Sequence, residues 1–122
     1  MNRIGEFNFE NLLAGDFPRT TDSVVMKAGK VYPVGSVIGR ETATGECALV
    51  DSTKSDGTEK VYGVLSVEVD ATKGAFPGIA FLTGEYNQNR LTFGGTDTHD
   101  KHKDAARERC IFFKDAALLS DQ

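Results

Sequence analysis

The residues that come nearest to a metal site lie between positions 97 and 104. His99 and His102 are three residues apart, a spacing that puts two imidazoles on one face of a helix, where they could meet one ion. Asp97, Asp100 and Asp104 lie close to them in the chain. These residues alternate with lysines in the pattern of a solvated helix face, and no cysteine or further histidine completes a four-ligand zinc site. We therefore expect neither a metal nor a cofactor.

The two cysteines are the next candidates for chemistry, because a thiolate can act as a nucleophile. Cys110 is predicted on the apolar side of a helix, where burial makes a thiol inert. Cys47 and Cys110 are far apart in the chain and outside any C-x-x-C spacing. Two reduced, buried thiols are therefore favoured over a disulfide.

Three aromatic residues, Phe81, Tyr86 and Phe93, lie near a polar turn and could stack on a sugar or a base. Phe81 and Phe93 occupy positions that more often belong to a core. The pattern leaves open an alternative function, a small β-barrel that binds a carbohydrate or other ligand through the edge from Tyr86 to Phe93. The sequence holds no Walker loop and no G-x-G-x-x-G, G-x-S-x-G or H-E-x-x-H motif, so we expect no enzyme and no small-molecule substrate.

Length and charge set the broad class of protein. A chain of 122 residues supports one domain with one hydrophobic core. The net charge of −4 argues against nucleic acid as a partner, since nucleic-acid modules usually carry a basic patch. No apolar run is long enough to span a membrane or to form a signal peptide, so we expect a protein that is made in the cytoplasm and is not attached to a membrane.

Short β-strands are predicted along most of the chain, organised around residues 31–45. Three glycines break that stretch into two extended segments, and its β-branched residues favour a sheet. The fold class is therefore mainly β with one short α-helix, in a compact, strongly bent sheet that forms a single domain. The other predicted strands are 23–27, 47–50, 61–69, 79–83 and 111–113, with a strand, a polar turn and a short return over 82–93. An exposed polar loop is predicted at 51–60 and a Gly/Pro loop at 71–78.

The second half of the strand predicted at 61–69 alternates strictly in character. Leu65, Val67 and Val69 should lie on one face and Ser66 and Glu68 on the other.

The predicted helix begins after residues 94 and 95, both glycine. Asp97 is a favourable N-cap, and Asp100 in the first turn suits the helix dipole, as do Arg107 and Arg109 in the last turn. The helical spacing predicts one apolar face, made of His102, Ala105, Ala106, Cys110 and Phe113.

The first 20 residues differ from the rest of the chain. Phe7 and Phe9 alternate with polar residues, which is the pattern of a strand, but no second strand follows within hairpin reach. The segment is either a terminal strand docked on its own domain or an arm that orders on another protein by adding a strand to its sheet edge. The candidate partner-binding side chains are Ile4, Phe7, Phe9, Leu12, Leu13 and Phe17.

Five short sequences, taken together and in order, resemble the lambda-type bacteriophage head decoration proteins. They are Asn11–Pro18, Ala43–Gly45, Val69–Thr72, Leu82–Asn87 and Ala105–Lys114. The residues at 51–60 and those after Lys114 do not fit the family's pattern.

The resemblance implies a small, trimeric β-rich protein, a "β-tulip" with a little helix. Such a protein binds the major capsid protein of the same phage on the outside of the expanded head, at three-fold positions, and stabilises the shell. Its N-terminal arm is disordered in isolation and orders on the capsid, which favours the second reading of this segment. We therefore expect a capsid-binding arm at residues 1–20, a decoration domain at residues 21–122, and a location on the outer surface of the virion.

Overall fold

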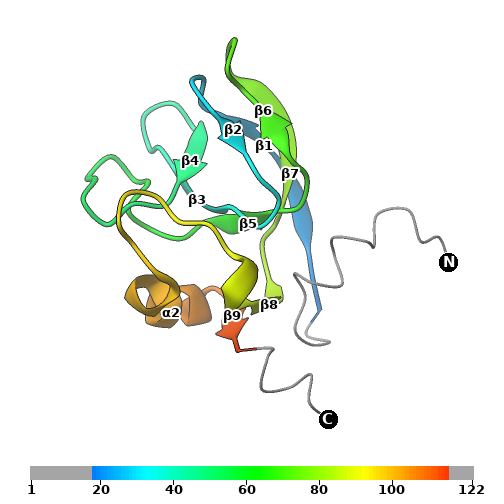
Figure 1. Cartoon of the computed structure of the whole chain (residues 1–122), viewed down its shortest axis with the longest axis vertical. Helices are drawn as coiled ribbons and strands as arrows, with labels where there is room; N and C mark the ends of the chain where they lie inside the picture. The colour runs from blue at the N-terminus through cyan, green and yellow to red at the C-terminus, as the bar shows by residue number, and fades with distance from the viewer. Residues whose placement is uncertain (1–17, 116–122) are drawn as a thin grey trace, which may run out of the picture.

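Short strands follow one another through most of the part of the chain that the structure describes, residues 18–115 of a computed structural model (Figure 1). Within this range there is one α-helix, so the prediction of a mainly β single domain with one short helix is confirmed. The elements are β1 (Thr21–Met26), β2 (Val31–Tyr32), β3 (Val37–Arg40), β4 (Cys47–Leu49), β5 (Gly63–Leu65), β6 (Val69–Asp70), β7 (Phe76–Phe81), β8 (Gly84–Asn87), the 3₁₀ turn η1 (Gln88–Arg90), α2 (His99–Glu108) and β9 (Ile111–Lys114).

Five of these strands close into a small barrel in the order β1-β4-β3-β5-β7. β1 and β7 form its longest ribbon, an antiparallel pairing that runs from Thr21–Phe81 to Met26–Phe76. β4 closes the ring by pairing with β1 in parallel through Met26 and Cys47. Closure gives each barrel strand a neighbour on both sides, which covers edges that an open sheet would expose.

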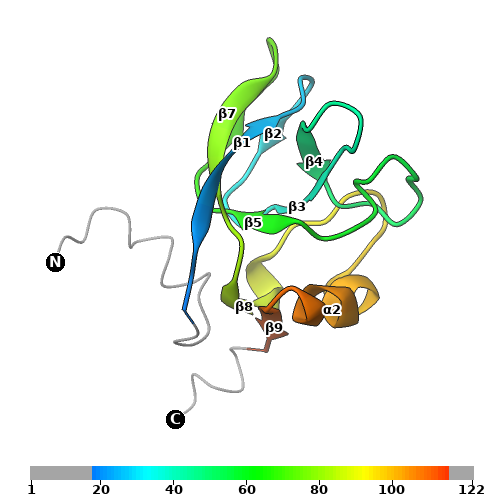
Figure 2. The same ribbon diagram turned by 180° about the vertical axis from the view of Figure 1, so that it is seen from behind.

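Two small sheets lie at opposite ends of the barrel. β8 and β9 pair in parallel from Gly84–Ile111 to Asn87–Lys114, and α2 packs beside them. β2 and β6 pair at the other end. Figures 1 and 2 show β8, β9 and α2 together at the lower end of the molecule, and Figure 1 shows β2 and β6 near the upper part of β1 and β7.

Two clusters of buried side chains make up the core, and β3 and β5 separate them. Val37 and Ile38 are consecutive in β3 yet belong to different clusters, and the same is true of Val64 and Leu65 in β5. All four side chains are fully buried. Because successive side chains of a strand point to opposite faces, these two strands present an apolar face to each cluster.

The strand predicted over 61–69 is divided in the structure. β5 ends at Leu65, where the backbone and the hydroxyl of Ser66 both donate hydrogen bonds to the carbonyl of Ile79, each at 2.8 Å. Ser66 is therefore buried, contrary to the predicted alternation, and Val67 is exposed. The chain resumes as β6, which pairs with β2 rather than with the barrel.

The return strand predicted after the polar turn is also absent from the described residues. Between η1 and α2 the β pairing is limited to an isolated parallel bridge between Ser36 and Thr92, and β8 pairs with β9 instead. Part of the loop predicted at 71–78 is strand, since β7 begins at Phe76. Pro77 is tolerated in β7 because its missing N–H has no partner to bind. Backbone groups of residues two apart point to the same side of a strand, so the nitrogen of Pro77 faces the side on which the Ile79 carbonyl accepts from Ser66. On that side β5 has already ended.

The helix differs from its prediction at both ends. Thr98, not Asp97, is the N-cap residue, and it makes no side-chain capping bond. His102 and Ala106 are buried as expected, but Ala105 is exposed. Cys110 is also exposed, which contradicts its predicted burial, because the helix has ended and the residue has a φ of 63° in the turn to β9.

Candidate partner-binding surfaces

The side chains predicted to bind a partner, Ile4, Phe7, Phe9, Leu12, Leu13 and Phe17, lie outside the described residues. The first described residue is Pro18, and its carbonyl already accepts a hydrogen bond from the domain. The point from which residues 1–17 must extend is therefore defined.

That point is fixed by hydrogen bonds to Thr83. The Thr83 hydroxyl donates to the carbonyl of Pro18 at 2.8 Å and accepts from the backbone N–H of Thr20 at 3.1 Å. The carbonyl of Thr20 accepts from the N–H of Leu82 at 2.7 Å, which continues the β1–β7 ladder by one step. On the N-terminal side these bonds are made by backbone groups of Pro18 and Thr20. The position of these two residues, here called the root of the N-terminal segment, therefore depends little on the side chains that precede it.

Close packing constrains two residues that follow Thr83, Gly84 and Tyr86. Tyr86 is fully buried, its hydroxyl donates to the carbonyl of Thr83, and burial raises the pKa of that hydroxyl. Gly84 has a φ of +135°, and a Cβ there would lie 2.6 Å from the Tyr86 hydroxyl and 2.8 Å from Cγ of Arg19. Only glycine fits both the backbone conformation and the space. Gly84 and Tyr86 therefore constrain the site where the N-terminal segment joins the domain.

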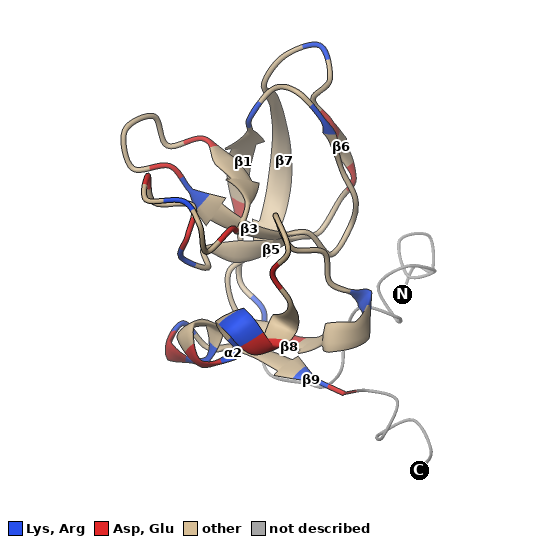
Figure 3. Cartoon of the chain, turned by 60° about the vertical axis from the view of Figure 1, so that its left-hand side comes forward, with Lys and Arg blue, Asp and Glu red and all other residues tan. Residues whose placement is uncertain are grey.

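A second candidate surface is the outer face of the β1–β7 ribbon. Ser23 pairs with Ile79 and Val25 pairs with Pro77, so these four residues lie on one face of the ribbon. Val25 is 43% and Ile79 47% exposed, and Phe76 at the start of β7 is 54% exposed. Figure 3 shows β7 without a charged residue along its length. Exposed apolar side chains that adjoin one another are typical of association surfaces.

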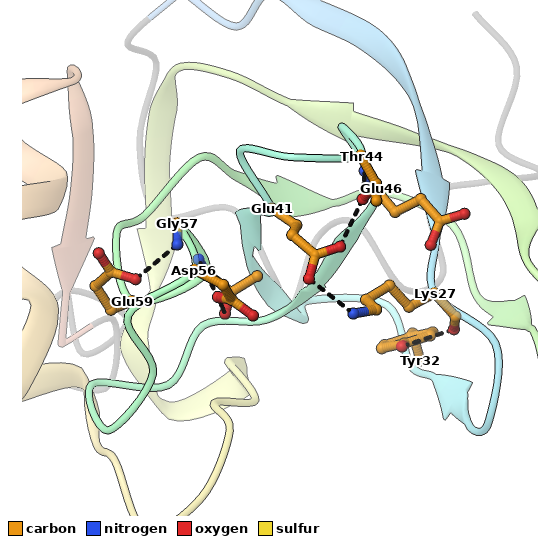
Figure 4. Close-up of polar contacts among 9 residues, drawn as sticks. Lys27, Tyr32, Glu41, Thr44, Glu46, Asp56, Gly57 and Glu59 are labelled. Carbon is orange, nitrogen blue, oxygen red and sulfur yellow. Dashed lines mark hydrogen bonds and ion pairs between the residues drawn. The ribbon is translucent and has the colours of Figure 1, made fainter.

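Acidic side chains gather on the loops between β3 and β5, around Lys27 (Figure 4). The ammonium of Lys27 lies 3.1 Å from Glu41, whose other oxygen accepts from the Thr44 hydroxyl at 2.6 Å. The bonds from Thr44 and Lys27 lower the pKa of the Glu41 carboxyl. These contacts join the residue after β1 to the loop after β3, and within the cluster Lys27 and Glu41 neutralise each other.

The loop at 51–60 is fixed to the barrel by one buried residue. Thr58 is 3% exposed, in a loop that the sequence predicts to be polar and exposed. Its N–H and hydroxyl donate to the carboxylate of Asp56, which lowers the pKa of that carboxyl. A Cβ at Gly39 would lie 2.5 Å from the Thr58 carbonyl oxygen. Glycine in β3 is required there for close approach of the loop, not for a bend.

Of the residues considered for a metal site, Asp97 and His102 form a buried hydrogen-bonded pair instead. The carboxylate of Asp97 accepts hydrogen bonds from the N–H and hydroxyl of Ser52, at 2.6 and 2.8 Å, and from Nε2 of His102 at 2.7 Å. The side chains of Asp97 and His102 are 3% and 5% exposed. His99 contacts Asp100 instead. Within residues 18–115 no group of three or more His, Cys, Asp or Glu is placed to hold a metal ion.

The electrostatics of Asp97 follow from these contacts. Burial by itself would raise the pKa of Asp97, but the hydrogen bonds from His102 and Ser52 outweigh it and hold the pKa at about 2. The imidazole of His102 also stacks on Phe93, with the ring centroids 5.8 Å apart. Asp97 thus links α2 to the loop at 51–60. Ser52 and Asp97 are 45 residues apart in sequence, so the spacing of residues did not predict this contact.

The three aromatic residues considered as a ligand-stacking platform, Phe81, Tyr86 and Phe93, belong to the core or pack against it. Phe81 and Tyr86 are buried in the core cluster that contains Val37 and Val64, with their ring centroids 5.7 Å apart. Phe93 packs against the same cluster, between His102 and Phe113. The alternative ligand-binding function therefore loses the residues on which it rested.

The two thiols also differ from each other. Cys47 is buried as predicted, and burial raises the pKa of its thiol to about 11. Cys110 is exposed.

Comparison with known proteins comes down to one family. The family model described as "Bacteriophage lambda head decoration protein D" matches residues 4–111, which is most of the chain and includes the greater part of the N-terminal segment. Among curated proteins, none matched the chain. No helix within residues 18–115 has the length and apolar character needed to cross a membrane.

Proposed function

We propose that this chain, which belongs to the bacteriophage lambda head decoration protein D family, binds the major capsid protein through residues 1–17 and stabilises the shell as a homotrimer. Membership of the family gives the chain a role in capsid decoration and places it on the virion. The mode of binding, the trimer and the gain in shell stability are the parts that we add. The family match over residues 4–111 is the observation that carries the proposal, because it joins the N-terminal segment and the β domain in one unit.

The N-terminal segment has the chemistry for adding a strand to another protein. Phe7 and Phe9 would enter pockets on one face while backbone groups pair with an open strand edge. Ordering such a segment costs about 1–2 kcal/mol per residue in backbone entropy, so a single arm should bind modestly. The anchored root at Pro18 and Thr20 supports this arrangement, because it gives the arm a fixed origin.

Three-fold self-association would raise the affinity of such arms. Once one arm is bound, the others bind intramolecularly, which increases avidity by roughly 10²–10⁴. Val25, Pro77 and Ile79 on the β1–β7 ribbon are the exposed apolar residues that we assign to the contact between subunits. Covering them on association removes apolar surface from water.

The proposal is tested by mixing the purified protein with expanded, undecorated capsids, followed by sedimentation. Deletion of residues 1–17 should leave a folded trimer that has lost most of its affinity for capsids. If the shortened protein binds and stabilises capsids as well as the full chain, the arm is not the binding element.

A matched pair of variants tests the side chains of the arm. Replacing Phe7 and Phe9 with Asp should weaken binding strongly, because charged groups would have to enter apolar pockets. Replacing Glu6 and Asn8 with Asp puts Asp at the two alternate positions of the same strand pattern and should have little effect. Equal losses in the two variants would contradict strand addition with one inserted face.

A further inference from the structure

A pair of arginines without an acidic partner lies at the junction of β3, β5 and α2. The guanidinium of Arg40, the last residue of β3, lies over the Tyr62 ring, 5.7 Å from its centroid. The guanidinium of Arg109, just after α2, lies 5.6 Å from the centroid of the same ring. Among residues 18–115 neither arginine forms a salt bridge.

The backbone holds all three residues in place. Arg40 pairs with Cys47 in the barrel, and Tyr62 donates its N–H to the carbonyl of Ile38 at 2.7 Å. The N–H of Arg109 caps α2 by donating to Ala106 at 2.9 Å. The cation–ring contacts then restrict the two long side chains, which reduces the entropy lost when either binds a ligand.

Hollows lie on both sides of this group. One, of about 240 Å³, is lined by Arg40, Tyr62, Arg109, Lys60 and Glu59 among others. The second, of about 310 Å³, shares Arg40 and Tyr62 and reaches Asp22 and Val25 on β1. Arg40 and Tyr62 thus form a ridge between two open depressions, which suits an extended chain lying across both.

Local charge in the smaller hollow is opposite to that of the whole protein. Three cationic residues line it, while Glu59 is engaged by the N–H of Gly57 at 2.8 Å. The whole chain carries a net charge of −4. The two guanidinium groups on this ring repel each other, and an anion close to both would be attracted by both.

We propose that Arg40, Tyr62 and Arg109 form a binding site for the carboxylate side chains of an acidic polypeptide segment of a partner protein. A guanidinium over an aromatic ring keeps its in-plane N–H groups for paired hydrogen bonds to a carboxylate. Arg40 uses only its Nε, in a 3.4 Å bond to the carbonyl of Gly45. Carboxylates fit better than phosphates, because Glu59 and Asp22 border the hollows and would repel a doubly charged group more strongly. The smaller hollow shares no residue with the proposed subunit contact, whereas the larger one includes Val25 and Pro77 of that contact.

The test is a titration of the full-length protein with the peptide acetyl-Gly-Glu-Gly-Glu-Gly-amide, followed by NMR. Signals of the Arg40 and Arg109 side chains and of the Tyr62 ring should shift, and the glutamine version of the peptide should give no shift. Replacing both arginines with Gln should lower the affinity about tenfold or more, as expected for loss of charge-assisted hydrogen bonds. Tyr62→Leu keeps both charges but removes the ring, and should lower the affinity about two- to fivefold.

The matched control replaces Arg90 and Arg107 with Gln, which changes the net charge by the same amount at exposed positions elsewhere. This variant should bind the peptide nearly as well as the parent protein. The proposal is overturned if the control loses as much affinity as the Arg40 and Arg109 variant, or if the parent protein shows no shift at millimolar peptide. Tighter binding of inorganic phosphate than of the peptide would overturn the assignment to carboxylates. Thermal unfolding of each variant shows that a loss of binding is not a loss of fold.

Discussion

The β1–β7 ribbon and the α2 region are both surface features, but they present opposite chemistry to the solvent. The ribbon has apolar residues on both faces: Met26 and Ala80 are buried within the barrel, while Val25 and Ile79 point outward. α2 carries charged residues outward and is fixed from within by the buried contacts of Asp97. Among residues 18–115 the large exposed apolar side chains, Val25, Val31, Val67, Phe76 and Ile79, all belong to the barrel ribbon or the β2–β6 end.

This difference indicates which surface is complete in a single subunit. The outer face of α2 is charged and leaves no large apolar side chain in water. A ribbon that leaves apolar side chains in water gains free energy when another surface covers them. Five experiments can break or sharpen this contrast.

The largest effect is expected from the inner face of the ribbon. Met26 is fully buried, so Met26→Ala should lower the free energy of unfolding by about 2–5 kcal/mol through lost packing and a cavity. Chemical denaturation measures the loss. Ser23→Ala, on the outer face of the same strand, should change it by less than about 0.5 kcal/mol. Similar losses in both variants would show that the two faces of β1 are not distinct.

A smaller loss is expected where Asp97 joins α2 to the loop at 51–60. Asp97→Ala leaves Ser52 and His102 without their buried acceptor and should cost about 1–3 kcal/mol. Asp104→Ala, at an exposed position on α2, is the control and should be nearly neutral. Equal stability of the two variants would mean that the contact contributes nothing.

The same carboxylate should give a dependence on pH. Its pKa is about 2 in the folded protein, below the ordinary value of 3.8, so its contribution to stability is complete above pH 3.8 and is lost as the pH falls towards 2. The difference in stability between the parent protein and Asp97→Asn should therefore shrink over that range. A constant difference would contradict the lowered pKa.

The outer face of the ribbon should matter for association and little for folding. Replacing Val25 and Ile79 with Ser should change the free energy of unfolding of the isolated subunit by less than about 0.5 kcal/mol each, because both side chains are already partly in water. The mass measured by sedimentation should fall from trimer to monomer. Lys101→Ser with Lys103→Ser on α2 is the control and should remain a trimer. A stable trimer of the ribbon variant would place the subunit contact elsewhere.

The smallest effect on the protein is expected from chemical labelling of its two thiols. A thiol reagent should modify Cys110 rapidly and leave Cys47 unmodified in the folded protein, since only Cys110 is exposed. Mass spectrometry of the intact protein should show a single addition. Labelling of Cys47 at a similar rate would mean that the barrel opens readily at β4.

Much of the strand content could be predicted because β-branched residues and turn residues act locally. β1, β4 and β9 lie within a residue or two of their predicted positions, and β3 falls within the extended stretch predicted at residues 31–45. The break at Ser66 could not be predicted, since the alternation of residues 65–69 is equally good for one strand, and only the carbonyl of Ile79 decides where β5 ends. Likewise β8 pairs with β9, about 25 residues away, and no local pattern indicates that pairing.

The sequence by itself determined the class of fold, the absence of known catalytic motifs and the family. These follow from composition, from local preferences and from short sequences that are read in order. Only the tertiary structure decided that Asp97 binds Ser52 and His102, that Cys110 is exposed, and that Arg40 and Arg109 both contact one tyrosine ring. The physical reason is that each of these facts depends on groups brought together by barrel closure and helix packing, across separations at which sequence spacing carries no information about distance.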